Sequence, residues 1–196
     1  AKDFLTEPFS NDQFRSVMDK LALVVPGLGG EQGRIISVIP AKGACGASMI
    51  AFNLACLLKK GGSARTLLAD LDPVTGTQAF QMKLKPVFSF IDILSHGSGL
   101  DVDVWRGVIQ AYSGIEVLLS PDQPIDGAQE NGDCRPVLDF ARKLYDNVIA
   151  DFGNPYGEWT LSGVHASDEI YLITTNELPA LQSAQRVMNY YEANGI

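Results

Sequence analysis

A short loop at residues 40–48 holds the groups with the clearest potential for chemistry. Its sequence is Pro-Ala-Lys-Gly-Ala-Cys-Gly-Ala-Ser, and it follows a β-branched apolar run and precedes a helical pattern. Backbone N–H groups of such a loop turn inward, and the N-terminus of the next helix adds partial positive charge, so the loop can cradle a phosphate chain. The residues predicted to contact that chain are Lys42, Gly43, Ala44, Cys45, Gly46, Ala47, Ser48 and Met49.

Three aspartates at strand ends are candidate partners of this loop. Asp70 ends one apolar run, Asp72 follows it, and Asp151 ends a later run, Asn-Val-Ile-Ala-Asp. The carboxyl ends of parallel strands meet at one edge of a sheet, and Mg²⁺ prefers carboxylate and hydroxyl oxygens. Carboxylates at these strand ends would lie beside the loop, where the Ser48 hydroxyl is placed to bind Mg²⁺. The alternative for Asp72 is that Asp-Pro and the following Thr-Gly only form a turn.

The elements that must position these groups alternate along the chain. Apolar runs predict strands at residues 34–39, 65–70, 115–119, 147–151 and 169–174. Helical spacing predicts helices at residues 48–59, 136–145 and 179–193, and an amphipathic helix at 14–23. Strands separated by helices of this length predict an α/β fold, a doubly wound, mostly parallel sheet with helices on both faces.

The phosphate loop resembles the deviant Walker A box of the MinD/ParA/ArsA superfamily, K-G-G-x-G-K-[ST]. Lys42 matches the early signature lysine, Gly43 and Gly46 match two of the three glycines, and Ser48 matches the hydroxyl position. The resemblance implies a three-layer P-loop fold, ATP and Mg²⁺ as ligands, and a homodimer in which the signature lysine reaches the partner's phosphates. Ala44 departs from the pattern by replacing the middle glycine.

Ala47 is the departure with the largest chemical consequence, because it replaces the second lysine of the box. In the family that lysine holds the β- and γ-phosphates and offsets charge as the terminal bond breaks. Losing one such charge-assisted contact costs about 2–4 kcal/mol of transition-state stabilisation. The sequence therefore predicts nucleotide binding with weak or absent hydrolysis.

Two further segments carry the same resemblance. Residues 67–76 resemble the switch segment L-L-x-D-x-D-P-Q-x-G, which implies that Asp72, supported by Asp70, approaches Mg²⁺ and that Asp72 is catalytic, although Val74 replaces the glutamine. Together with Ser48 and Asp151, these two aspartates form the Mg²⁺ site that the resemblance implies. Residues 145–153 resemble the Walker B strand Y-D-x-V-I-x-D-x-x-G, which implies that Asp151 faces Mg²⁺ and that Gly153 senses the γ-phosphate. The family's adenine-contacting strand would follow Ile196, so the nucleotide-binding domain, residues 34–196, is expected to be incomplete at its C-terminus.

The first residues suggest a subfamily. Residues 1–10 resemble the end of a response-regulator receiver domain, with Glu7 in place of its lysine, and the Gly-rich stretch 25–33 is expected to be a linker after a receiver-like tail at 1–24. A degenerate receiver tail before a degenerate MinD/ParA domain is similar to the CpaE/TadZ proteins of Flp/Tad pilus systems. This resemblance implies a cytoplasmic homodimer, at a cell pole or the inner-membrane face, that recruits pilus-secretion machinery.

Composition narrows the other possibilities. The formal net charge of −8 makes nucleic acid an unfavourable partner, and no apolar run is long enough to span a bilayer. The three cysteines, an odd number with wide spacing, favour reduced thiols. Two alternatives stay open: a ParA/MinD-like ATPase in DNA partition or division positioning, and a scaffold that has lost nucleotide binding.

Overall fold

The computed structural model describes residues 32–60, 65–97, 100–124 and 132–196. The predicted receiver-like tail, its amphipathic helix and residues 25–31 of the predicted linker lie outside these residues. Gly33, which we placed in that linker, is buried, and its amide donates to the Arg142 carbonyl at 2.9 Å. A Cβ on Gly33 would lie 1.8 Å from the Tyr145 carbonyl oxygen. The chain is therefore already packed against the domain one residue before its first strand.

The described residues form one six-stranded sheet with the order β3-β4-β2-β5-β1-β6. All pairings are parallel except that of β3 with β4. The predicted α/β fold with a mostly parallel sheet is confirmed, and the five predicted strands are present. The strand that was not predicted is β3, a three-residue edge strand. The strands are β1 (Arg34–Pro40), β2 (Thr66–Asp70), β3 (Gln110–Tyr112), β4 (Ile115–Leu118), β5 (Asn147–Asp151) and β6 (Glu169–Ile173).

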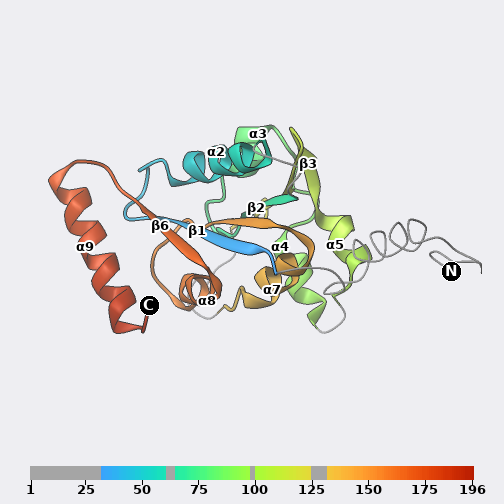
Figure 1. Ribbon diagram of the computed structural model, residues 1–196. Coiled ribbons are helices and arrows are strands. Elements are labelled where there is room, and N and C mark those ends of the chain that lie inside the picture. The colour runs from blue at the N-terminus through green and yellow to red at the C-terminus, as the bar shows by residue number, and fades with distance from the viewer. Residues whose placement is uncertain (1–31, 61–64, 98–99, 125–131) are drawn as a thin grey trace, which may run out of the picture.

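Helices cover both faces of the sheet, as Figure 1 shows, with α2 and α3 on one side and α4, α7 and α8 on the other. The predicted helices correspond to α2, α7 and α9, whereas the shorter α3, α4, α5 and α8 were not predicted. The helices are α2 (Ala47–Lys60), α3 (Gln78–Met82), α4 (Phe90–Ser95), α5 (Val102–Val108), α7 (Arg135–Leu144), α8 (Glu158–Ala166) and α9 (Leu178–Ala193).

Two apolar cores hold these layers together. On the α2 side, Ala47, Ala51 and Ala55 repeat every four residues and are buried against the sheet, because small side chains let the helix lie close to the strands. On the opposite side, large aromatic residues fill the core, among them Phe90, Trp105, Phe152 and Trp159. Both cores lie against the central strands β1, β2 and β5, which are accordingly apolar along most of their length.

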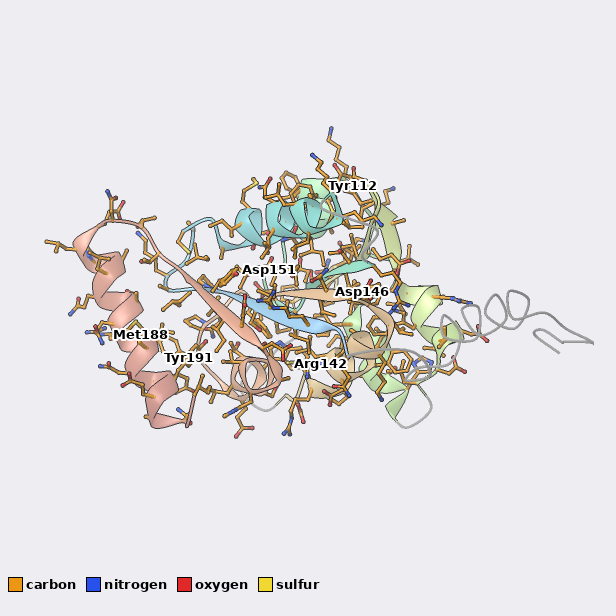
Figure 2. All side chains as sticks on the ribbon, viewed as in Figure 1. Tyr112, Arg142, Asp146, Asp151, Met188 and Tyr191 are labelled. Carbon is orange, nitrogen blue, oxygen red and sulfur yellow. The ribbon has the colours of Figure 1, made fainter. Side chains whose placement is uncertain are left out.

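Strand register brings the predicted site residues to one edge of the sheet. Asp151 lies opposite Val38 of β1 on one side and opposite Asp70 of β2 on the other. The phosphate loop, which follows β1, therefore adjoins the carboxyl ends of β2 and β5. Figure 2 shows Asp151 at the end of β5 that faces this loop, whereas Asp146 lies at the opposite end of the strand.

Candidate functional site

The loop after β1 borders a cavity of about 290 Å³ at the carboxyl edge of the sheet. The backbone turns sharply here, since Ala44 and Gly46 have positive φ angles of 59° and 88°. Glycine takes this conformation freely, whereas alanine at Ala44 stores strain of about 1 kcal/mol. The rest of the lining comes from the segments after β2 and β5, namely Asp72, Thr75, Thr77, Gln81, Phe152 and Gly153.

The predicted phosphate-contact residues separate into two groups. Gly43, Ala44, Cys45, Gly46, Ala47, Ser48 and Met49 all line the cavity. Lys42 is not among the lining residues. Its ammonium Nζ lies 2.8 Å from Glu177 Oε2, in the loop between β6 and α9, and the side chain of Glu177 is 62% exposed. The Lys42 ammonium lowers the pKa of Glu177, which keeps this carboxyl ionised at neutral pH.

The side chain of Ala47 contributes no charge to the cavity. Ala47 is the first residue of α2, is 6% exposed, and its methyl group packs into the core on the α2 side. None of the described residues that line the cavity is a lysine or an arginine. Attraction for an anion at this site must therefore come from backbone amides, the α2 N-terminus and any bound metal.

Behind the loop, Asp70 and Asp151 form a buried pair of carboxyl groups. They lie directly opposite each other on β2 and β5 and are 1% and 2% exposed. Burial raises the pKa of both carboxyls, and the neighbouring charge of Asp151 raises that of Asp70 further. Asp70 is tied inward, because its Oδ2 accepts hydrogen bonds from the Gln78 amide at 3.0 Å and the Ser120 hydroxyl at 3.3 Å.

Asp72 lines the cavity, but local contacts engage both of its oxygens. Oδ1 accepts from the amides of Val74 at 2.9 Å and Thr75 at 3.0 Å, and Oδ2 accepts from the Thr75 hydroxyl at 2.6 Å. Gly153 approaches the same carboxylate so closely that a Cβ there would lie 1.8 Å from Oδ2. Asp72 therefore closes a tight turn, which is the alternative role considered for it in the sequence. Its carboxylate also leaves room only for a glycine at residue 153. Its metal and catalytic roles stay predictions.

Sequence patterns gave no sign of Gln78, which is fully buried at the start of α3. Its Nε2 donates to the Ser48 carbonyl at 2.9 Å and to Asp151 Oδ2 at 2.7 Å. Gln78 therefore joins the phosphate loop to the predicted Walker B carboxylate. A single glutamine in a five-residue helix has no periodic pattern around it, so only the folded chain shows this contact.

The donor set suits a magnesium ion held largely by water and phosphate. No three His, Cys, Asp or Glu side chains in the described part of the chain are grouped to hold a metal unaided. Asp151 Oδ1, however, is buried without a hydrogen-bond partner, and the Ser48 side chain contacts the Asp151 carboxyl and lowers its pKa. Mg²⁺ in nucleotide sites keeps several waters and uses one or two protein oxygens. Ser48 and Asp151 are the residues that would hold it here.

The strand-loop-helix geometry defines an α/β fold of the P-loop kind, and comparison with solved structures finds the same fold. The ParA family ATPase from Chlorobium tepidum TLS matches with a TM-score of 0.71 and 22% identity over 81% of this chain and 67% of that one. A putative plasmid partition protein from Borrelia burgdorferi B31, bound to AMPPNP, gives 0.62 and 22% over 85% and 73%. The septum site-determining protein MinD from Pyrococcus horikoshii OT3, complexed with Mg-ADP, gives 0.62 and 18% over 84% and 67%.

No protein-family model and no curated protein matches the sequence. The solved structures that match include ATPases of the ParA and MinD kind and the kinase domain of the Escherichia coli tyrosine kinase ETK, and at these identities the likeness establishes the shared fold. Within the described residues, no helix combines the length and the apolar character that crossing a bilayer requires.

Proposed function

We propose that this chain binds ATP and Mg²⁺ in the cavity between the phosphate loop and the carboxyl ends of β2 and β5. The observation that carries the proposal is the convergence of the loop amides, Ser48 and the unpaired oxygen of Asp151 on one side of the sheet. Magnesium would offset the negative charge of the phosphates, which the lining side chains cannot do. The exposed backbone of Gly43, Ala44 and Gly46 is open to the phosphate oxygens.

The same site supports little or no hydrolysis. Ala47 places a methyl group where the related box has a lysine, and Val74 stands where the related switch has a glutamine. With Lys42 paired to Glu177, none of the described lining residues contributes a cation from within the protomer. The transition state gains charge on the phosphoryl oxygens, so a site without such cations binds nucleotide better than it cleaves it.

We further propose that the protein is a dimerising localisation factor for Flp/Tad-type pilus assembly. Support comes from the resemblance of residues 1–10 to a receiver end and of residues 34–196 to a MinD/ParA domain, the combination found in the CpaE/TadZ proteins. Its partners would be a second copy of the chain and proteins of the pilus-secretion machinery, at a pole or at the inner-membrane face of the cytoplasm.

Calorimetry with ATP tests the binding proposal directly. We expect saturable heat from the intact chain with ATP and Mg²⁺, and no detectable heat would overturn the proposal. Ala47→Lys should tighten ATP binding at least tenfold or create measurable phosphate release, because it restores a contact of about 2–4 kcal/mol. Asn53→Lys is the matched control: it adds the same charge on the exposed side of α2 and should change neither property.

A ParA-like ATPase in DNA partition is the second candidate, and the structural neighbours named for plasmid partition favour it. The net charge of −8 opposes it, because duplex binding depends on Lys and Arg displacing phosphate counterions. Phosphate release from ATP, measured with and without duplex DNA, separates the two. Stimulation by DNA would favour partition, whereas binding of ATP without turnover under either condition favours the localisation factor.

A further inference from the structure

Gln78 occupies a junction between three parts of the proposed site. Its backbone N–H donates to Asp70 Oδ2 at 3.0 Å, and its side-chain amide donates to both the Ser48 carbonyl and Asp151 Oδ2. One buried residue thus contacts the end of β2, the end of β5 and the start of α2. The side-chain contacts link residues 30 and 73 positions away, so they exist only because the sheet has folded.

The amide orientation is fixed by the chemistry of its partners. An ionised carboxylate and a backbone carbonyl are acceptors only, so the NH₂ group of Gln78 must face Asp151 and Ser48. Both amide hydrogens are then used, and the carboxylate of Asp151 is held through Oδ2. Two acceptors of this contacting pair, Gln78 Oε1 and Asp151 Oδ1, are buried without partners. Both acceptors lack a hydrogen-bond donor, and water bound to a cation is a strong donor.

The same residue begins the short helix that follows the predicted switch segment. Residues 71–77 connect β2 to Gln78. The carbonyl of Leu71, the first residue of this segment, accepts a hydrogen bond from the buried Trp159 indole at 2.7 Å. Further along α3, Gln81 lines the cavity, while Phe80 is 87% exposed. A shift of the Asp151 carboxylate would therefore be passed through Gln78 to the segment 71–77 and to the surface of α3.

We infer that Gln78 is a positioning residue that couples Mg²⁺ at Asp151 to the conformation of the segment 71–77. This inference rests on the proposed function, since it concerns how that nucleotide site is regulated. Gln78 holds Asp151 with one oxygen presented to the metal's water shell, and it holds the segment at the other end through Asp70. Removing the amide leaves the inward-facing N–H groups of the phosphate loop in place but disconnects the metal from the segment.

The first test compares ATP affinity with and without Mg²⁺ in the intact chain, using Gln78→Met, which keeps the length of the side chain and removes its hydrogen bonds. In the wild type, Mg²⁺ should strengthen ATP binding. In Gln78→Met, binding in EDTA should stay within about twofold, while the strengthening by Mg²⁺ falls by about 10- to 100-fold, as for other residues that orient metal ligands. Gln110→Met, on the exposed edge strand β3, is the control and should behave as wild type.

The second test measures amide hydrogen exchange in peptides that cover residues 71–78. Adding Mg²⁺ to the ATP-bound wild type and to Gln110→Met should slow exchange in these peptides, and Gln78→Met should show no slowing. If Gln78→Met does not fold, Gln78→Leu serves in its place, because its side chain is apolar and cannot donate to Asp151.

The outcomes separate the two proposals. Absence of ATP binding by the wild type in both buffers overturns the proposed function, and this inference with it. Equal strengthening by Mg²⁺ and equal slowing of exchange in wild type and Gln78 variants overturns the coupling alone. Loss of the Mg²⁺ effect together with a matching loss of affinity in EDTA also overturns it, because Gln78 would then support only the general structure of the pocket.

Discussion

The two sides of the candidate site differ in their exposure to solvent and in the side chains that form them. The phosphate loop at residues 40–48 exposes Gly43, Ala44 and Gly46 to solvent, and the side chains with which it lines the cavity are small. The carboxylate side, with Asp70, Asp72 and Asp151, is buried and interlocked by side-chain hydrogen bonds. Relative to the resembled motifs, the loop has lost a lysine and a glycine, whereas the aspartates are all present.

This contrast indicates which features of the proposed nucleotide site should tolerate substitution. Anion binding by a loop depends mainly on backbone amides, which remain when a side chain is replaced. A buried carboxylate instead depends on each neighbouring donor, because an unpaired buried charge is expensive. Substitution in the loop should therefore alter chemistry, whereas substitution on the carboxylate side should alter stability as well.

The largest expected effect is on the free energy of unfolding, when a glycine on the carboxylate side and a glycine in the loop are each replaced by alanine. Gly153→Ala would place a Cβ 1.8 Å from Asp72 Oδ2, and Asp72 is held by three hydrogen bonds and cannot easily yield. We expect a loss of about 2–3 kcal/mol in the free energy of unfolding, measured with urea. Gly43→Ala meets no atom within 4 Å and should change that free energy by less than about 0.5 kcal/mol. Similar losses in both variants would contradict the contrast.

The next effect concerns pH. Burial raises the folded-state pKa of Asp70 and Asp151 above the ordinary carboxyl value, so the folded chain binds more protons than the unfolded chain above about pH 4. Stability from these groups is complete at lower pH and is lost as pH rises through the raised values. We expect unfolding free energy, measured in EDTA, to fall by roughly 2 kcal/mol between pH 5 and 8.

Asp70→Asn should remove most of that slope, because the carboxyl whose pKa is raised further, Asp70, is gone. Asp133→Asn is the matched control. Asp133 is paired with Arg135, which lowers the pKa of its carboxyl, so it is ionised throughout this range and should leave the slope unchanged. A slope that survives Asp70→Asn would mean that the raised pKa of Asp70 is not the source of the pH dependence.

The smallest structural effect is expected on the loop side, at the Lys42–Glu177 pair. Because this ion pair is at the surface, Glu177→Ala should leave the urea midpoint unchanged. If Lys42 serves a partner's phosphates, as the family resemblance implies, the released lysine should increase dimerisation in ATP and Mg²⁺ a few-fold. Sedimentation velocity measures this, with Lys42→Ala as the comparison. An identical monomer–dimer balance in wild type and both variants would contradict a role for Lys42 in assembly.

The sequence alone determined the architecture and one side of the site. Long apolar runs and long amphipathic helices carry enough residues to show their period, so β1, β2, β4, β5, β6 and the helices α2, α7 and α9 could be predicted to within two residues at either end. The phosphate loop is contiguous in sequence, so the loss of lysine at Ala47 is visible without coordinates. The three-residue edge strand β3 and the helices of five to nine residues, such as α3 and α8, show too little of a period to be recognised.

Only the tertiary structure decided how the carboxylates are used. The sequence predicts the same metal-binding role for Asp70 and Asp151. Strand register places them opposite each other on neighbouring strands. Of the two, only Asp151 keeps an oxygen without a hydrogen-bond partner. Gln78 became part of the site because folding brings β2, β5 and α2 together around its amide. Charge proximity and hydrogen-bond partners depend on distances between segments far apart in the chain, which a local pattern of residue types does not contain.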